Sequence, residues 1–175
     1  MRIACVLAKD FEDSEFQIPY DAFEGAGHSV TVIGARAGES LDGKKGKATA
    51  RVDLAIDEAR PDAFDALFIP GGKSPAQLRE DPRFVRFAAA FAKKPIFAVC
   101  HGPQLLIAAD MVRGRTLTGW PSVQTELSQA GAKAVDREVV VDGNIVTSRK
   151  PEDLPAFVRQ SLAALGPAKP SASAS

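Results

Sequence analysis

The 175-residue chain is 45% hydrophobic and 25% charged, which is an ordinary composition for a globular protein with one well-formed core. Lysine plus arginine and aspartate plus glutamate each total 22, so the formal net charge is zero. No long-range field therefore attracts nucleic acid, an anionic membrane or an acidic partner. We expect one domain over residues 1–166, with no nucleic-acid or membrane partner.

The N-terminal apolar run is too short for the core of a signal peptide, because charged residues follow from Lys9 onward. No other run approaches the ~18 apolar residues of a membrane span. The two cysteines, Cys5 and Cys100, belong to separate predicted strands and offer no disulfide framework. We interpret both as reduced thiols of a cytoplasmic protein, and Cys5 as a packing residue of the core.

The first third of the chain predicts a β-α-β unit. Residues 2–8 form an apolar run typical of a buried parallel strand, and residues 12–25 carry apolar side chains along one helical face. Residues 29–34 form the second strand, which implies a right-handed crossover. Glycines punctuate residues 35–60, where we expect an edge strand or hairpin off the main sheet, near residues 48–56.

The rest of the chain continues the alternation of strands and helices. Residues 63–70 predict a core strand that a glycine pair closes, followed by one helix over about 75–92. The later predictions are a strand ending at Cys100 with a helix directly after it, a short strand at 116–118, a helix at 123–130, a hairpin over 135–148 with an Asp-Gly turn, a helix at 151–165 and a disordered tail at 167–175.

This order of elements predicts an α/β fold, a doubly wound flavodoxin-like sandwich with a mostly parallel sheet, helices on both faces and an extra hairpin. In such sheets, sites form beyond the carboxyl ends of the strands, at a switch in strand order. Three loops meet this condition, at residues 9–15, 71–75 and 100–103.

Cys100 lies where an apolar strand stops and a Gly-Pro pair opens a helix, which is the pattern of a nucleophile elbow. The amino end of the following helix is expected to favour a thiolate. The alternative is that Cys100 is a small buried residue at a strand end, which is common for cysteine. Metal binding is not expected, because the two cysteines and two histidines have no ligand-like spacing.

Other polar residues of the three loops suggest partners for this cysteine. Glu12 and Asp13 are explained by helix capping, whereas Glu15, one turn into the helix, can point towards Cys100 if their strands are near neighbours. His101 suits proton transfer near neutral pH. Gly71 and Gly72 offer backbone N–H groups for an oxyanion, although a tight turn would also explain them.

Four motifs together resemble the DJ-1/PfpI superfamily, and more closely its PfpI branch of protease-like stress proteins. They are FEDSE at 11–15, IPGGKSP at 69–75, AVCHGPQ at 98–104 and VVDGNIVTSR at 140–149. The resemblance implies Cys100 as nucleophile, Glu15 as its carboxyl partner, His101 as acid-base group, Gly71, Gly72 and the His101 amide as oxyanion site, and Glu12 and Trp120 as further substrate contacts. It also implies a homodimer or higher homo-oligomer and no cofactor.

Two positions depart from the protease-type members of that superfamily. Ala76 stands where those members carry an acidic residue that reaches the histidine across a subunit contact, and Trp120 stands where tyrosine is usual. Indole cannot exchange a proton as phenol can. Both departures favour a second activity known in the superfamily, in which a Cys100 thiolate adds to a small reactive aldehyde such as methylglyoxal, as in glutathione-independent glyoxalases and deglycases.

The same residues suggest three other functions. A PfpI-type cysteine peptidase remains an alternative, with a peptide as substrate. A redox-sensing or chaperone-like stress protein, in which Cys100 is oxidised reversibly, is a second. A class I glutamine amidotransferase is set aside, because that family needs a histidine downstream of the cysteine and none follows His101.

Overall fold

The structure is a computed structural model that describes residues 1–167. Its centre is a sheet of seven strands in the order β10-β11-β7-β6-β1-β2-β5. Every neighbouring pair in this sheet is parallel except β10 and β11, which form an antiparallel hairpin at one edge. The strand order reverses between β6 and β1, so the loops that follow these strands open onto a crevice.

The strands are β1 Arg2–Val6, β2 Ser29–Gly34, β3 Ser40–Asp42, β4 Thr49–Arg51, β5 Leu54–Ala55, β6 Ala66–Ile69, β7 Ile96–Val99, β8 Thr116–Leu117, β9 Lys133–Ala134, β10 Val140–Asp142 and β11 Ile145–Ser148. The helices are α1 Asp13–Gly25, α2 Ser74–Leu78, α3 Pro82–Ala89, α4 Pro103–Ala108, α5 Pro121–Gln129 and α6 Leu154–Leu165. Short 3-10 turns occupy Ile56–Glu58, Pro61–Ala63 and Pro151–Asp153.

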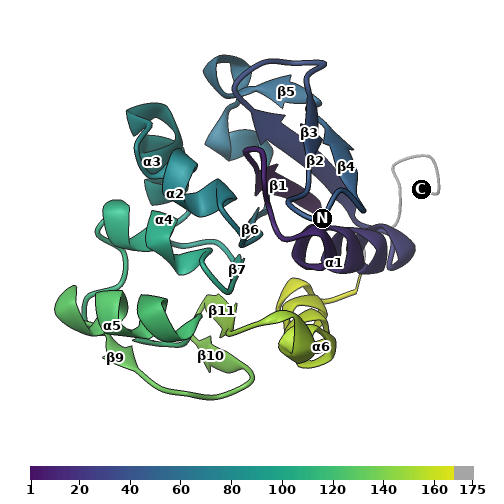
Figure 1. The fold of residues 1–175 in the computed structure, drawn as a ribbon. Helices are drawn as coiled ribbons and strands as arrows, with labels where there is room; N and C mark the ends of the chain where they lie inside the picture. Colours follow the sequence, from purple (N-terminus) through teal and green to yellow (C-terminus); the bar gives the residue numbers. More distant parts are fainter. Residues whose placement is uncertain (168–175) are drawn as a thin grey trace.

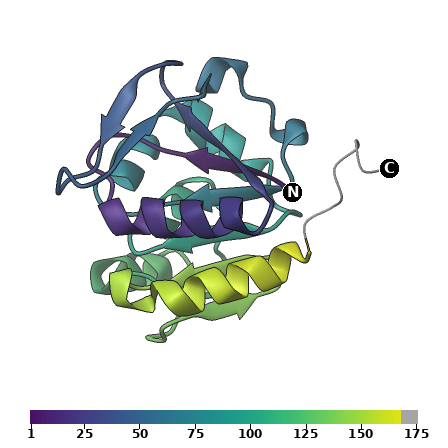
Figure 2. The same ribbon diagram turned by 90° about the vertical axis from the view of Figure 1, so that its right-hand side faces the viewer.

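Helices cover both faces of the sheet (Figure 1). Helices α1 and α6 lie side by side on one face (Figure 2), where Phe23 and Phe157 pack on Phe68. Helices α2 to α5 cover the other face, and Phe91 and Leu105 belong to the core there. Because β1, β6 and β7 are covered on both sides, their residues are almost all buried, as expected for a parallel sheet. The predicted α/β sandwich is confirmed.

Several predicted elements have the expected type and place. The β1-α1-β2 unit is present, and β2 occupies the predicted residues 29–34. The Asp-Gly turn joins β10 to β11, with Gly143 at a φ of 56°. The last helix has its regular part at Leu154–Leu165, after a 3-10 turn that begins at Pro151. Helix α5 begins at Pro121, two residues before the predicted start.

The prediction of one helix over 75–92 is wrong. Helix α2 ends at Leu78, and α3 begins at Pro82 with the Asp81 side chain accepting the backbone N–H of Arg83. Proline cannot continue a helix, but it suits the first turn of a new one after an aspartate N-cap.

Strand pairing differs from the prediction at two places, β5 and β9. Within residues 35–60, β3 and β4 form the expected hairpin off the main sheet, but β5 joins the main sheet beside β2. The β10–β11 hairpin is part of the main sheet, because β11 pairs with β7. Strand β9, which was not predicted, pairs with β8 in a small separate sheet.

The disordered tail predicted at 167–175 lies outside the described residues from position 168 onward. Within residues 1–167, no helix combines the length and apolar character that a membrane crossing needs.

Candidate functional site

Cys100 lies on the turn between β7 and α4, with a φ of 64°. A positive φ is unusual for a residue with a side chain and marks a strained backbone position. Hydrogen bonds hold the turn on both sides: the Cys100 N–H donates to the Ser148 carbonyl at 2.9 Å, and the Trp120 N–H donates to the Cys100 carbonyl at 3.0 Å. The turn is therefore fixed by β11 and by the loop before α5.

Glu15 reaches Cys100 although their strands are not adjacent. Strand β1, which precedes Glu15, and strand β7, which precedes Cys100, are separated in the sheet by one strand, β6. The loop after β1 is joined to the glycine loop after β6, because Phe11 forms a β-bridge with Gly72 and the Glu12 N–H donates to the Gly71 carbonyl at 3.2 Å. This pairing carries the start of α1, and with it Glu15, over the end of β6.

Gly71 is the residue that allows the close approach. A Cβ at this position would lie 2.3 Å from Oε1 of Glu15 and 2.8 Å from the Cβ of Cys100. Gly72 has a φ of 77°, and a Cβ there would lie 2.3 Å from the backbone nitrogen of Glu12. The glycine pair thus places two chemically active groups together, which a simple tight turn would not require.

The Glu15 carboxyl is fully buried, and neither of its oxygens makes a regular hydrogen bond to another described residue. The Cys100 thiol and the Gly71 N–H are near enough to affect its titration. Burial, and then the negative charge of Glu12, raises the pKa of Glu15 from its ordinary 4.5 to about 8. At neutral pH Glu15 is therefore mostly a protonated acid that can donate a hydrogen bond or a proton.

Cys100 does not have the lowered pKa that its turn suggested. Burial, and then the negative charge of Glu15, raises the pKa of the Cys100 thiol well above its ordinary value. The backbone N–H groups of His101 and Gly72 act in the opposite direction but do not outweigh burial. Burial therefore opposes the thiolate that the turn suggested, and a base that takes the thiol proton would assist the sulfur when it reacts.

His101 is placed to be that base. Its Nδ1 lies 3.3 Å from Sγ of Cys100. Burial, and then the positive charge of Lys44, lowers the pKa of His101, so the ring is neutral near pH 7 and one ring nitrogen can accept a proton. The Trp120 ring stacks on the imidazole with centroids 6.0 Å apart, and this contact helps to orient the imidazole ring.

The acidic residues at the start of α1 do not cap it. Glu12 is the N-cap residue, but its side chain makes no cap hydrogen bond and instead binds Lys44 at 2.9 Å and Lys45 at 3.0 Å. The Asp13 carboxylate is buried and accepts the backbone N–H groups of Lys45, Lys47 and Ala48 at 2.8 Å each. Both residues therefore hold the loop between β3 and β4 against the site, and the capping interpretation is wrong.

The side chains line a cavity of about 500 Å³. Five of the predicted site residues line it, namely Glu12, Glu15, Cys100, His101 and Trp120. Five further lining residues were not predicted, namely Lys44, Lys45, Lys150, Pro151 and Glu152. A separate cavity of about 460 Å³, next to Leu7 and Phe84, has no cysteine or histidine in its lining.

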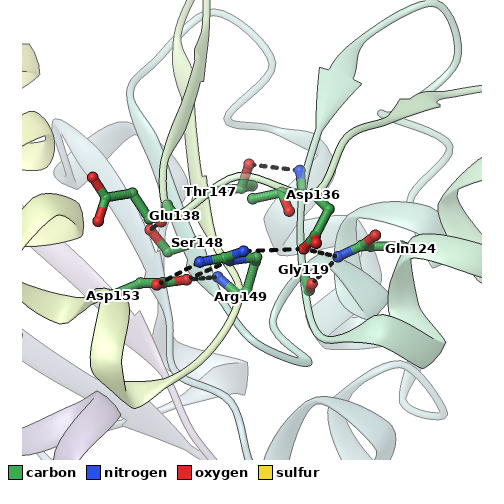
Figure 3. A network of polar contacts seen from close by, with 9 residues as sticks. Gly119, Gln124, Asp136, Glu138, Thr147, Ser148, Arg149 and Asp153 are labelled. Carbon is green, nitrogen blue, oxygen red and sulfur yellow. Dashed lines mark hydrogen bonds and ion pairs between the residues drawn. The ribbon is translucent and has the colours of Figure 1, made fainter.

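A polar network fixes the wall that carries Lys150 (Figure 3). Arg149 donates to both carboxylate oxygens of the buried Asp153, at 3.0 and 3.1 Å, and to Asp136 at 3.1 Å. Gln124 continues the network by donating to Asp136 and to the carbonyl of Gly119, the residue before Trp120. The segment after β11 and the loop of Trp120 are therefore held relative to each other.

The described residues contain no group of three or more His, Cys, Asp or Glu side chains arranged to hold a metal ion. The groups available for chemistry at the cavity are a thiol, a neutral imidazole, a protonated carboxyl group and backbone N–H donors. Such a set can perform nucleophilic addition with proton transfer.

Comparison with known proteins agrees with the fold. The sequence matches the DJ-1/PfpI family over residues 1–164. The chain belongs to this family. Among family relatives, it is 52% identical over 168 residues to "Protein/nucleic acid deglycase 2" of Escherichia coli (strain K12), covering 94% of this chain and 98% of the relative. It is 53% identical over 167 residues to "General stress protein 18" of Bacillus subtilis (strain 168), covering 94% and 97%.

A solved structure of the family is also similar. The DJ-1/ThiJ/PfpI-like part of a two-domain protein from Anabaena variabilis, which also contains a ferritin-like domain, superposes with a TM-score of 0.92 and 40% sequence identity. The alignment covers 95% of this chain and 48% of the other, so the present chain spans about half of that protein.

Proposed function

We propose that this chain is a cysteine-dependent stress-response enzyme that converts small reactive carbonyls, α-oxoaldehydes such as methylglyoxal, to hydroxy acids without glutathione. The observation that carries the proposal is the buried Glu15 carboxyl beside the Cys100 thiol, with Nδ1 of His101 3.3 Å from the same sulfur. A protonated acid, a nucleophile and a neutral base then meet at one cavity. The names of the Escherichia coli and Bacillus subtilis relatives, a deglycase and a stress protein, are consistent with this role.

In the first step, Sγ of Cys100 adds to the aldehyde carbon while His101 takes the thiol proton through Nδ1. The electron pair of the C=O bond moves to oxygen, which receives the proton of Glu15. The product is a hemithioacetal, with an imidazolium and a Glu15 carboxylate beside it. The N–H groups of His101 and Gly72, which already point towards the sulfur, can stabilise negative charge on a nearby oxygen.

In the second step, the Glu15 carboxylate removes the proton on the former aldehyde carbon, and the imidazolium protonates the neighbouring ketone oxygen to give an enediol. Glu15 then returns its proton to the former ketone carbon, and the hydroxyl proton of the sulfur-bearing carbon goes back to Glu15. This internal transfer oxidises one carbon to a thioester and reduces the other to an alcohol. No external oxidant or reductant is needed.

In the last step, His101 takes a proton from water as the water attacks the thioester. The C–S bond breaks, the sulfur recovers its proton from the imidazolium, and the hydroxy acid leaves. The sum is oxoaldehyde plus water to hydroxy acid. The side chains that exchange protons or form bonds, those of Cys100, Glu15 and His101, all line the cavity.

The test is lactate formation from methylglyoxal by the purified protein. We expect turnover by the wild type, loss of turnover in Cys100→Ala, and near-normal turnover in Cys5→Ala, because Cys5 is fully buried in the core and takes no part in the cavity. An inactive wild type, or a Cys100→Ala variant as active as the wild type, would contradict the proposal.

A second candidate is a redox sensor, which the difference in access between the two thiols favours: Cys100 lines the cavity, whereas Cys5 has no exposed surface. Intact-mass measurement after mild peroxide tests it. Oxygen uptake at Cys100 before Cys5 supports the sensor, and equal or no uptake counts against it.

A further inference from the structure

We propose that this cavity selects oxoaldehydes that carry a carboxylate, and that Lys150 is the residue that recognises the anionic group. The inference rests on the proposed carbonyl chemistry at Cys100 and adds the substrate class to it. It is carried by the distribution of charged side chains around the cavity and by the contacts that hold them.

Positive side chains line the cavity from both sides of strand β7, the strand that precedes Cys100. Lys44 and Lys45 come from the loop between β3 and β4, which packs on the start of α1, and Lys150 comes from the segment after β11. In the sheet, β11 lies on one side of β7, and β6 and β1 lie on the other. A substrate bound at Cys100 therefore lies between cations contributed from opposite directions.

The negative side chains of the cavity do not cancel this charge where a substrate would lie. Glu12 is shared by two lysines, so this trio keeps one positive charge. Glu15 is mostly neutral at pH 7 because its pKa is raised to about 8. Glu152 is exposed to solvent. Lys150 forms no ion pair within 4.0 Å among the described residues, so its ammonium group is available to a ligand.

Both cationic walls are held in place before a substrate arrives. Arg149, the neighbour of Lys150, is fixed by Asp153 and Asp136 (Figure 3). On the other wall, the buried Asp13 fixes the backbone of Lys45 by a hydrogen bond of 2.8 Å. The backbone that carries Lys45 and Lys150 therefore loses little conformational entropy when an anion binds.

The cavity also has room for a substituent beyond the reacting carbonyl. Its volume of about 500 Å³ falls within the range of roughly 300–1,000 Å³ that is usual for small-molecule sites. A three-carbon aldehyde would leave most of this space to water. A chain of two methylene groups ending in a carboxylate would extend from Cys100 towards the rim.

The experiment compares 4,5-dioxopentanoate, an oxoaldehyde with a carboxylate, with its uncharged methyl ester. For the wild type, we expect kcat/KM to be about fivefold higher for the acid, the size of a partly exposed ion pair, and the preference to shrink as salt is added. In Lys150→Gln, kcat/KM should fall for the acid and stay unchanged for the ester, so that most of the preference is lost, while Lys150→Arg should keep it. Lys47→Gln is the matched control, because Lys47 is exposed on the same loop as Lys44 but does not line the cavity.

The outcomes separate this inference from the proposed function. If neither compound nor methylglyoxal is converted, the carbonyl chemistry itself is wrong. If acid and ester are converted equally and Lys150→Gln changes neither, the chemistry stands and the anion preference is wrong. A Lys150→Gln variant that loses both substrates to the same extent also overturns the inference, because recognition of a carboxylate would not affect the ester.

Discussion

Replacing Glu15 by glutamine should become steadily more favourable for stability as the pH rises from 5 to 7. In the unfolded chain this carboxyl titrates near its ordinary pKa of 4.5, whereas in the folded protein burial and Glu12 raise its pKa to about 8. Below pH 4.5 both states are protonated, and folding carries no penalty from this group. As the pH rises, the unfolded state releases the proton and the folded state does not, so stability is lost progressively up to about pH 8.

The magnitude follows from the two pKa values. Each pH unit between them is equivalent to about 1.4 kcal/mol, so the penalty grows by about 2.5 kcal/mol between pH 5 and pH 7. Glutamine has nearly the shape of the protonated acid but cannot ionise. For each protein, the free energy of unfolding at pH 5 is compared with that at pH 7. This change should differ by about 2.5 kcal/mol between variant and wild type, and any constant effect of the amide cancels in the comparison.

The assay is urea unfolding of both proteins at pH 5, 6 and 7. Asp13→Asn is the control, because the pKa shift of Asp13 has the opposite sign. Burial raises the pKa of Asp13, but the N–H groups of Lys45, Ala48 and Lys47 outweigh it, and the net pKa is lowered. That variant should be destabilised by a nearly constant amount over pH 5–7, because Asp13 is ionised in both the folded and the unfolded state above its ordinary pKa of 3.8. A Glu15→Gln effect that stays constant with pH, or that becomes more destabilising towards pH 7, would refute the reasoning.

The remaining predictions concern the geometry around the thiol. Gly71→Ala should lower kcat/KM for methylglyoxal by about a hundredfold, because the new Cβ would fall between Glu15 and Cys100; an active variant would contradict this. Arg149→Gln should lower the free energy of unfolding in urea by about 3 kcal/mol, because the buried Asp153 loses its ion-pair partner and keeps only the backbone N–H of residue 149, whereas breaking the exposed contact alone with Asp136→Asn should change it by less than about 1 kcal/mol. Equal effects would be inconsistent with the network. Trp120 is the only tryptophan, so ligand binding should change the intrinsic fluorescence, and Trp120→Phe should abolish the signal.

The main features of the fold could be predicted because they depend on local patterns. Apolar runs of strand length and a helical spacing of aromatic residues predicted the β1-α1-β2 unit. The break between α2 and α3 was also signalled locally, by an aspartate followed by a proline, but the apolar periodicity on both sides masked it. The pairing of β9 with β8 was not foreseeable, since a strand of two residues carries almost no pattern.

The sequence predicted which loops and residues form the site better than it predicted their charges and pKa values. Strand ends and glycines indicated the loops that carry Cys100, Glu15 and Gly71. The lysines that bind Glu12 come from a loop more than 30 residues away, and no local pattern links them to it. The raised pKa of Cys100 follows from burial by the whole fold, whereas the turn alone suggested the opposite direction. For Lys150, a signal existed in its position directly after a strand end of the parallel sheet.

The central claim is that Cys100 and Glu15 act together on small carbonyls. The most direct measurement follows methylglyoxal turnover and cleavage of fluorogenic peptides side by side in one preparation, with Cys100→Ala and Glu15→Gln. We predict turnover of methylglyoxal that falls sharply in both variants, with little peptide cleavage. Peptide cleavage that depends on Cys100, together with no conversion of methylglyoxal, would contradict the account.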